Sequence, residues 1–341
     1  MNLLAPVRSA DEVAPLVSAG ATELFGAVAP RALFAKYSRA VWISRRGASA
    51  SLPDLSQLID VTREASRFGA RFYLALNAPR LPVEAFDALA QLAENAVSRA
   101  GAAGVIVADV GLMSELGRRK IPFVASTVAV AHNSEALLLF HDLGASRAVL
   151  PRHLTVPEIA AMKARVGARL ELEVLVYFDE CAFEEGLCRT QHEIGPLGAF
   201  CKISWTHRLT RQDGSAPDPN DAALFDEATR RHRAWLDAGE PPCGSGESQR
   251  GLDACGLCAL PELIRAGVRT FKVAGRQRSL GPRRLAVERV SAVLARAEED
   301  PAGAQELALR LVGPGPCESG VACYFESAAG PRLHPSARRS S

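Results

Sequence analysis

The chain lacks an apolar run long enough to cross a membrane, and this excludes the usual helical class of integral membrane proteins. Its first residues are apolar but have no basic segment before them, so they do not resemble a secretory signal. Net charge is also small, +2 over 341 residues. Proteins that grip nucleic-acid backbones usually carry a stronger basic bias. We therefore expect a cytoplasmic protein with no membrane span and a small-molecule rather than a nucleic-acid partner.

Several catalytic motifs are missing as well. No Gly-x-Gly-x-x-Gly follows the first apolar run, which removes the main signal of a dinucleotide-binding fold. The sequence has neither the Gly-x-Ser-x-Gly of serine hydrolases nor the His-Glu-x-x-His of zinc peptidases. It also has no convincing Cys–His nucleophile pair. These absences argue against a peptidase.

Short apolar runs of β type alternate with amphipathic helical segments along most of the chain. Eight strands are predicted, at 3–6, 22–27, 71–76, 104–108, 122–125, 147–150, 170–177 and 270–274. Helices are predicted at 10–19, 54–68, 82–100, 110–118, 134–143, 156–166, 257–266 and 282–298. Strict βα alternation implies a parallel sheet, and eight units favour a closed (β/α)8 barrel of the TIM type. An open doubly wound sheet is the alternative.

The alternation breaks between the seventh strand and its helix. We expect one barrel domain at 1–312 that includes a long insertion at 178–254, followed by a Pro/Gly/Ser-rich tail at 313–341. Insertions at the carboxyl ends of barrel strands build active sites. A structureless loop of this length needs a functional or cofactor reason. The less polar stretch 317–325 of the tail is expected to fold back over the barrel.

Half of the eight cysteines lie in this insertion. Their spacing is Cys-x6-Cys-x12-Cys-x41-Cys, at Cys181, Cys188, Cys201 and Cys243. Thiolates are strong ligands for soft metals. Structural zinc sites usually use tight Cys-x2–4-Cys pairs, which this set lacks, so an iron–sulfur cluster is the better fit. The alternative is that these cysteines are small buried apolar residues.

A second set comprises Cys255, Cys258, Cys317 and Cys323. It could form a second metal or cluster site, or Cys255 and Cys258 could act as a redox pair. It is equally consistent with Cys258 packing against the helix core and the tail cysteines having no role.

Several segments resemble one known family. They are 20–26, 125–127, 147–152, 173–176 leading to Cys181, 257–264, and 271–279. The last contains Lys272-Val273-Ala274-Gly275-Arg276, close to the family's Lys-Ile-Glu-Gly-Arg. The chain resembles the collagenase-like peptidases, peptidase family U32, and within it the ubiquinone-biosynthesis branch of UbiU and UbiV. It departs from the family at Ala274, where the motif has glutamate, and at Tyr177-Phe178, where it has His-Gly.

The resemblance implies a barrel that holds a [4Fe–4S] cluster on Cys181, Cys188, Cys201 and Cys243. It further implies oxygen-independent hydroxylation, with prephenate as oxygen donor in several branches. Short members act on a quinone precursor as a heterodimer of related barrels, whereas members that act on RNA carry further C-terminal sequence.

A dicarboxylate donor requires cationic groups at the barrel mouth, and Arg152, Lys272 and Arg276 lie at strand ends. We therefore expect these three residues to bind substrate or take part in catalysis. Asp109 is expected to cap a helix, and His132 and His153 are expected to be surface residues. The expected function is an iron–sulfur-dependent hydroxylase of a small aromatic or quinone-like substrate. The alternatives are a non-catalytic cluster-bearing partner subunit, an RNA-base hydroxylase and a peptidase.

Overall fold

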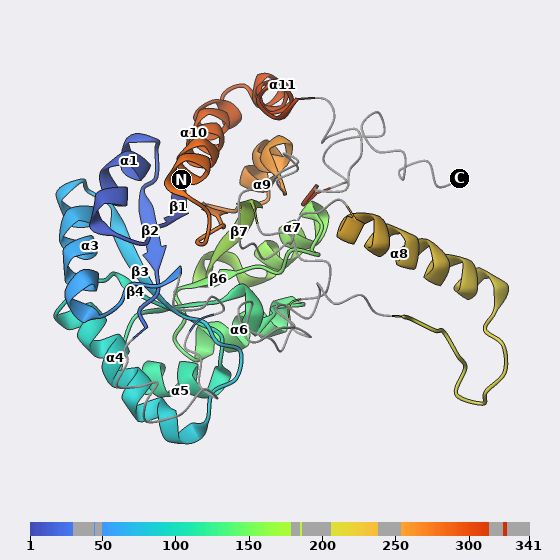
Figure 1. The fold of residues 1–341 in the computed structure, drawn as a ribbon, viewed down its shortest axis with the longest axis horizontal. Coiled ribbons are helices and arrows are strands. Elements are labelled where there is room, and N and C mark those ends of the chain that lie inside the picture. The colour runs from blue at the N-terminus through green and yellow to red at the C-terminus, as the bar shows by residue number, and fades with distance from the viewer. Residues whose placement is uncertain are drawn as a thin grey trace.

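Eight parallel strands close into a barrel in the order of the sequence, and helices surround it (Figure 1). The computed structural model describes residues 1–29, 44, 50–178, 185, 206–237, 254–313 and 323–325. The first and last strands pair in parallel, with Asn2 opposite Thr270 and Leu4 opposite Lys272. This closure confirms the predicted (β/α)8 barrel and shows that the open-sheet alternative is wrong.

The strands match their predicted ranges to within one residue at each end. They are β1 (Asn2–Pro6), β2 (Glu23–Gly26), β3 (Arg71–Leu76), β4 (Gly104–Val107), β5 (Phe123–Ala125), β6 (Arg147–Val149), β7 (Glu171–Tyr177) and β8 (Thr270–Val273). Almost every strand residue is buried. That burial explains why the strands read as continuous apolar runs rather than as alternating patterns.

The helices between the strands also follow the prediction. They are α1 (Val13–Ser18), α3 (Leu55–Arg67), α4 (Phe86–Ser98), α5 (Val110–Arg118), α6 (Ser134–Asp142), α7 (Val156–Val166), α9 (Leu260–Arg265) and α10 (Leu280–Ala297). Short 3-10 turns precede several of them, including η1 (Ala10–Glu12), η4 (Val83–Ala85) and η9 (Leu257–Ala259). Side-chain caps fix the starts of α3, α5, α6 and α7, and Thr155 and Glu158 form a full capping box on α7.

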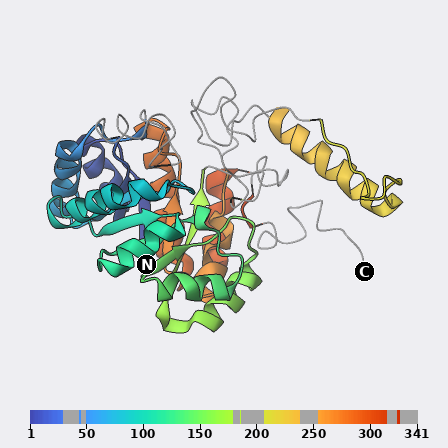
Figure 2. The same ribbon diagram turned by 90° about the horizontal axis from the view of Figure 1, so that it is seen from below.

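Two further helices were not predicted. Helix α11 (Pro301–Val312) begins with an Asp300 cap, packs beside α10 and buries Ala304 and Ala308. Helix α8 (Pro219–Asp237) lies in the insertion and projects from the barrel (Figure 2). None of its described side chains is buried. It lies within 178–254, which was expected to be an insertion without regular structure. In the part of the chain that the structure describes, we find no helix with the length and apolar character of a membrane span.

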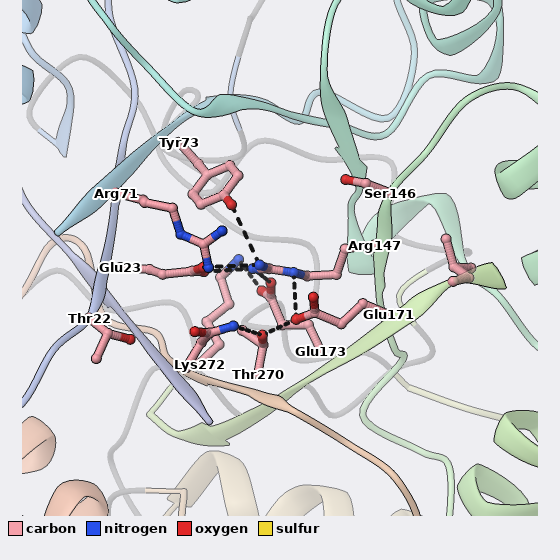
Figure 3. Close-up of polar contacts among 12 residues, drawn as sticks. Thr22, Glu23, Arg71, Tyr73, Ser146, Arg147, Glu171, Glu173, Thr270 and Lys272 are labelled. Carbon is pink, nitrogen blue, oxygen red and sulfur yellow. Dashed lines mark hydrogen bonds and ion pairs between the residues drawn. The ribbon is translucent and has the colours of Figure 1, made fainter. Parts of the chain in front are cut away.

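Charged rather than apolar side chains fill the amino-terminal end of the barrel interior (Figure 3). The Arg147 guanidinium donates to both carboxylate oxygens of Glu23, at 2.7 and 3.0 Å, and to Glu173 at 3.1 Å. Desolvation alone would lower the pKa of Arg147, but the hydrogen bonds and charges of Glu23 and Glu173 outweigh it and raise the pKa. The guanidinium therefore stays charged. Since the amino-terminal end of such barrels serves stability, we assign this network to the fold.

Candidate functional site

The carboxyl ends of the eight strands meet at the opposite face, where (β/α)8 enzymes build their active sites. Ser126 follows β5 directly, Arg152 lies three residues after β6, and Arg276 lies three residues after β8. Asp109 accepts the backbone N–H of Leu112 at 3.1 Å at the start of α5. Its predicted role as a helix cap is confirmed.

Arg276 is almost fully enclosed at this face, with 4% of its surface exposed. Its Nη2 lies 2.5 Å from the hydroxyl of Ser44, which is also buried. This hydrogen bond joins the chain after β8 to the segment between β2 and α3. Gly275 precedes the arginine with a φ of 77°, a left-handed backbone that glycine adopts without steric cost. A guanidinium held in this way is suited to bind a carboxylate through its paired N–H donors.

Lys272 lies within β8, deeper in the barrel than Arg276. Its Nζ is 3.0 Å from Oε1 of Glu173 and 4.4 Å from the centre of the Phe25 ring. Burial lowers the pKa of Lys272, and the charge and hydrogen bond of Glu173 act against that shift. The structure thus connects this lysine to the interior network of Figure 3. Its expected contact with a substrate carboxylate stays a prediction.

Arg152 contacts a carboxylate of the protein itself. Glu185, 2% exposed, forms an ion pair with the Arg152 guanidinium. The same carboxylate accepts the backbone N–H of Arg152 at 2.9 Å and the hydroxyl of Thr127 at 2.9 Å. Glu185 belongs to the insertion, between Cys181 and Cys188 in the sequence. The contact therefore fastens the insertion to the chain that follows β5 and β6.

Phe178, the first residue after β7, has a left-handed backbone with a φ of 62°. A residue other than glycine pays about 1–2 kcal/mol for this conformation. The Phe178 ring meets Tyr177 edge-on, with the centroids 4.8 Å apart, and lies 4.2 Å from the guanidinium carbon of Arg278. The Phe178 N–H donates to the carbonyl of Ala254 at 2.8 Å. These contacts hold a strained residue where the insertion begins.

The C-terminal tail returns to the same end of β7. Cys323 is the parallel bridge partner of Cys255, and the N–H of Tyr324 donates to the Cys255 carbonyl at 3.0 Å. The Tyr324 hydroxyl donates to the carbonyl of Phe178. For these described tail residues, the expected return to the barrel is confirmed.

The predicted cluster ligands Cys181, Cys188, Cys201 and Cys243 lie outside the described residues, as does Cys317. The cluster site therefore stays a prediction. Cys255, Cys258 and Cys323 are described and half-buried, and the Cys255 sulfur accepts the N–H of Leu257 at 3.5 Å. Within the described ranges, no three or more His, Cys, Asp or Glu side chains are grouped to hold a metal ion. These three cysteines do not form the expected second site by themselves, and that site stays a prediction.

Two contacts at the mouth were missed by reasoning from the sequence. The exposed rings of His132 and His153 stack with their centroids 5.2 Å apart and an interplanar angle of 30°. Both follow neighbouring strands, β5 and β6, and that shared position was the available signal. The Glu185 contact carried only a weak signal, an acidic residue between two predicted metal ligands.

Comparison with known proteins places these features in a family. The sequence pattern of the family described as Peptidase family U32 matches residues 9–311. The tRNA hydroxylation protein P1 of Bacillus subtilis (strain 168) is 26% identical over 234 residues, which are 66% of this chain and 50% of the relative. The 23S rRNA 5-hydroxycytidine C2501 synthase of Escherichia coli (strain K12) is 24% identical over 242 residues, 70% of this chain and 32% of the relative. The chain thus spans half or less of the length of these two relatives.

A solved structure supports the fold alone. A Pseudomonas aeruginosa protein described as a dihydrodipicolinate synthetase superposes with a TM-score of 0.50 at 8% identity, over 91% of this chain and 81% of that chain. At so low an identity, the likeness says nothing about substrate or reaction.

Proposed function

Because the chain belongs to peptidase family U32, we propose that it is an oxygen-independent, iron–sulfur-dependent hydroxylase of an aromatic ring. One observation carries the proposal. Two relatives named for hydroxylation match 66% and 70% of this chain. The barrel mouth adds a buried guanidinium, Arg276, within the motif by which the sequence resembles this family.

The cluster would be held by Cys181, Cys188, Cys201 and Cys243. Four thiolates are the donor set of a [4Fe–4S] cluster, and their wide spacing does not match that of structural zinc sites. Glu185 follows the first of these cysteines by four residues and precedes the second by three. Since each residue spans at most about 3.6 Å, covalent geometry tethers both to within about 14 Å of Glu185. When bound, the cluster would supply single-electron transfer.

The chain's own residues would bind and orient the reactants. Replacing a ring hydrogen with a hydroxyl group removes two electrons from the ring, so an oxygen donor or a separate acceptor must take them up. We propose a dicarboxylate donor, with prephenate as the expected example, bound by Arg276. The hydrogen bond to Ser44 would fix the plane of this guanidinium and so the position of the donor.

Lys272, which lies deeper in the barrel than Arg276, would exchange a proton during the reaction. Burial lowers its pKa, which is the direction a lysine needs to exchange a proton at neutral pH. Glu173, 3.0 Å away, would orient the ammonium. Arg152 is paired with Glu185, so we assign it a positioning role rather than direct contact with the donor.

For the substrate, we propose a small aromatic or quinone-like ring. A nucleobase of RNA is the second candidate, and it is favoured by a specific observation: the names of both relatives specify tRNA or rRNA. The net charge of +2 favours the small molecule. The two candidates share the chemistry of ring hydroxylation and differ in how the ring is delivered to the mouth.

Deleting the gene in the source organism tests the proposal. Cells grown without oxygen would be analysed by mass spectrometry for quinone intermediates and for nucleosides from total RNA. Loss of a hydroxylated quinone intermediate supports the first candidate, and loss of a hydroxylated nucleoside supports the second. Complementation with the wild-type gene should restore the product, whereas the Arg276→Gln gene should not. If neither product changes, the proposed function is wrong.

A further inference from the structure

We propose that Glu185 is a positioning residue that seats the cysteine-bearing insertion on the barrel mouth. It would do so by filling an anion site built from Thr127 and Arg152. The purpose of this contact, to hold two cluster ligands over the mouth, rests on the proposed function. The contact itself does not.

Three donors converge on this one carboxylate. Oε1 accepts the Thr127 hydroxyl at 2.9 Å and pairs with the Arg152 guanidinium, while Oε2 accepts the Arg152 backbone N–H at 2.9 Å. Glu185 is 2% exposed, and the side chain of Arg152 is 16% exposed. A carboxylate is costly to bury unless it is paired and hydrogen-bonded. Here both of its oxygens have donors.

The donors belong to the rigid barrel. Thr127 follows Ser126, whose N–H donates to the carbonyl of Val107 at 2.7 Å at the end of β4. Arg152 lies two residues after Leu150, whose N–H donates to the carbonyl of Glu173 in β7 at 2.8 Å. The sheet ladder thus fixes the anion site independently of the insertion. A site built on strand ends can position a loop more accurately than another loop could.

The location of Glu185 in the chain explains what the contact would achieve. The insertion is also held where it starts and finishes, because the Phe178 N–H donates to the Ala254 carbonyl at 2.8 Å. Each further contact that ties such an insertion to the barrel divides one long loop closure into shorter ones. Glu185 anchors the chain seven residues after Phe178. Both ends of the segment containing Cys181 are therefore fixed, and Cys188 follows soon after.

The other ion pairs among the described residues have different roles. Many join residues three or four apart on one helix, such as Arg118 with Glu115. The buried pair of Arg147 and Glu23 braces the barrel interior. The pair of Arg152 and Glu185 joins the barrel to the insertion, so losing it should loosen the insertion without unfolding the core.

The test compares Glu185→Gln and Glu185→Ala with Glu135→Gln. The control glutamate forms an exposed ion pair with Arg165 and should contribute little. Each protein would be purified without oxygen, then examined by limited proteolysis and by hydrogen exchange over residues 178–190. Both Glu185 variants should be cleaved within 179–253 at least about tenfold faster than wild type, because local opening becomes more frequent. The control variant should match wild type.

Iron retention and unfolding temperature are measured on the same samples. Because Glu185 would hold the segment that carries two cluster ligands, more frequent opening of that segment should make the Glu185 variants lose iron to a chelator about tenfold faster. Their unfolding temperatures should stay within a few degrees of wild type. If Glu185→Ala does not fold, Thr127→Val keeps both charges, removes one donor and should shift cleavage in the same direction by a smaller factor.

The outcomes separate the two proposals. Unchanged cleavage and exchange in the Glu185 variants would overturn the positioning role, whatever the iron content. Faster cleavage in a protein that carries no iron even as wild type would support the positioning role and overturn the cluster. The double variant Arg152→Glu, Glu185→Arg exchanges the two charges. It should be cleaved more slowly than either single variant and so recover part of the wild-type protease resistance.

Discussion

Across the barrel interior, the guanidinium of Arg147 on β6 donates to both carboxylate oxygens of Glu23 on β2, at 2.7 and 3.0 Å. Both side chains are buried, and Glu173 adds a further contact at 3.1 Å. These strands lie on opposite sides of the barrel, so the charges connect parts of the sheet that share no ladder hydrogen bonds. The amino-terminal end of the barrel is thus held by ion pairs that depend on one another.

Removing Arg147 should therefore destabilise the fold strongly. Arg147→Met removes the cation that Glu23 and Glu173 share and leaves them only Arg71 and Lys272 as charged partners among the described residues. Breaking a buried ion pair by removing one partner costs about 3–5 kcal/mol. Chemical denaturation should show a loss of that size in the free energy of unfolding. Arg165→Met, which removes an exposed partner of Glu135, should change it by less than about 0.5 kcal/mol. Equal effects of the two substitutions would show that the network does not brace the barrel.

At position 178, a glycine variant should be more stable than an alanine variant, which is the reverse of the usual order. Its φ of 62° is unfavourable for alanine and free of cost for glycine. Both substitutions lose the same ring contacts, so Phe178→Gly should be more stable than Phe178→Ala by about 1 kcal/mol. At exposed Glu94 in the middle of α4 the order should be normal, with glycine about 1 kcal/mol less stable than alanine. An alanine variant at 178 more stable than the glycine variant would contradict the strain.

Glu12 should contribute to the loss of stability in acid. Desolvation raises its pKa, but the bond and charge of Arg283, with the backbone N–H of Arg8, outweigh this and leave the pKa below 4.5. Because the folded-state pKa of Glu12 lies below its unfolded value, the ionised carboxylate stabilises the fold fully above about pH 4.5. This stabilisation is lost as the pH falls through the folded-state pKa. The difference in unfolding free energy between wild type and Glu12→Gln should therefore shrink below that pH. A difference that stays constant from about pH 3 to 7 would contradict the assignment.

Arg276 should matter more for turnover than for folding. Arg276→Gln should lower kcat/KM of the hydroxylation about 100-fold, or about 2.7 kcal/mol, because it removes the buried charge that would pair with the donor carboxylate. Arg276→Lys keeps the charge but loses the planar pair of donors, so its loss should be smaller. Exposed Arg284→Gln serves as the control and should have no effect. Wild-type turnover in Arg276→Gln would exclude this arginine from donor binding.

The barrel could be predicted almost completely from the sequence. Its strands are buried on both faces and therefore read as apolar runs, and glycines such as Gly69 and Gly144 mark the helix ends. Helix α8 was missed because all of 178–254 was interpreted as a loop from its content of Gly, Pro, Asp and Arg. The interior network did leave a signal: charged residues such as Glu173 and Lys272 stand within otherwise apolar strands. Lys272 was expected to contact the substrate, which stays a prediction, and its hydrogen bond to Glu173 was not foreseen.

The site was less accessible to prediction because its contacts join distant parts of the chain. Arg152 was correctly expected at the mouth, but its partner Glu185 lies 33 residues away in a segment without periodicity. In the sequence, the strain at Phe178 shows only as a departure from the glycine in the family motif, because the type of a residue does not specify its backbone angles. The four predicted ligands from Cys181 to Cys243 lie outside the described residues. Their role has to be tested in solution.

The most direct test of that role is the iron and sulfide content of the protein purified without oxygen. We predict about four iron and four sulfide per chain, which is the content of one cubane. The content should fall to background when Cys181 and Cys188 are both replaced by serine. About eight of each would mean that Cys255, Cys258, Cys317 and Cys323 hold a second cluster. Zinc alone, or no metal in a folded wild-type protein, would contradict the account.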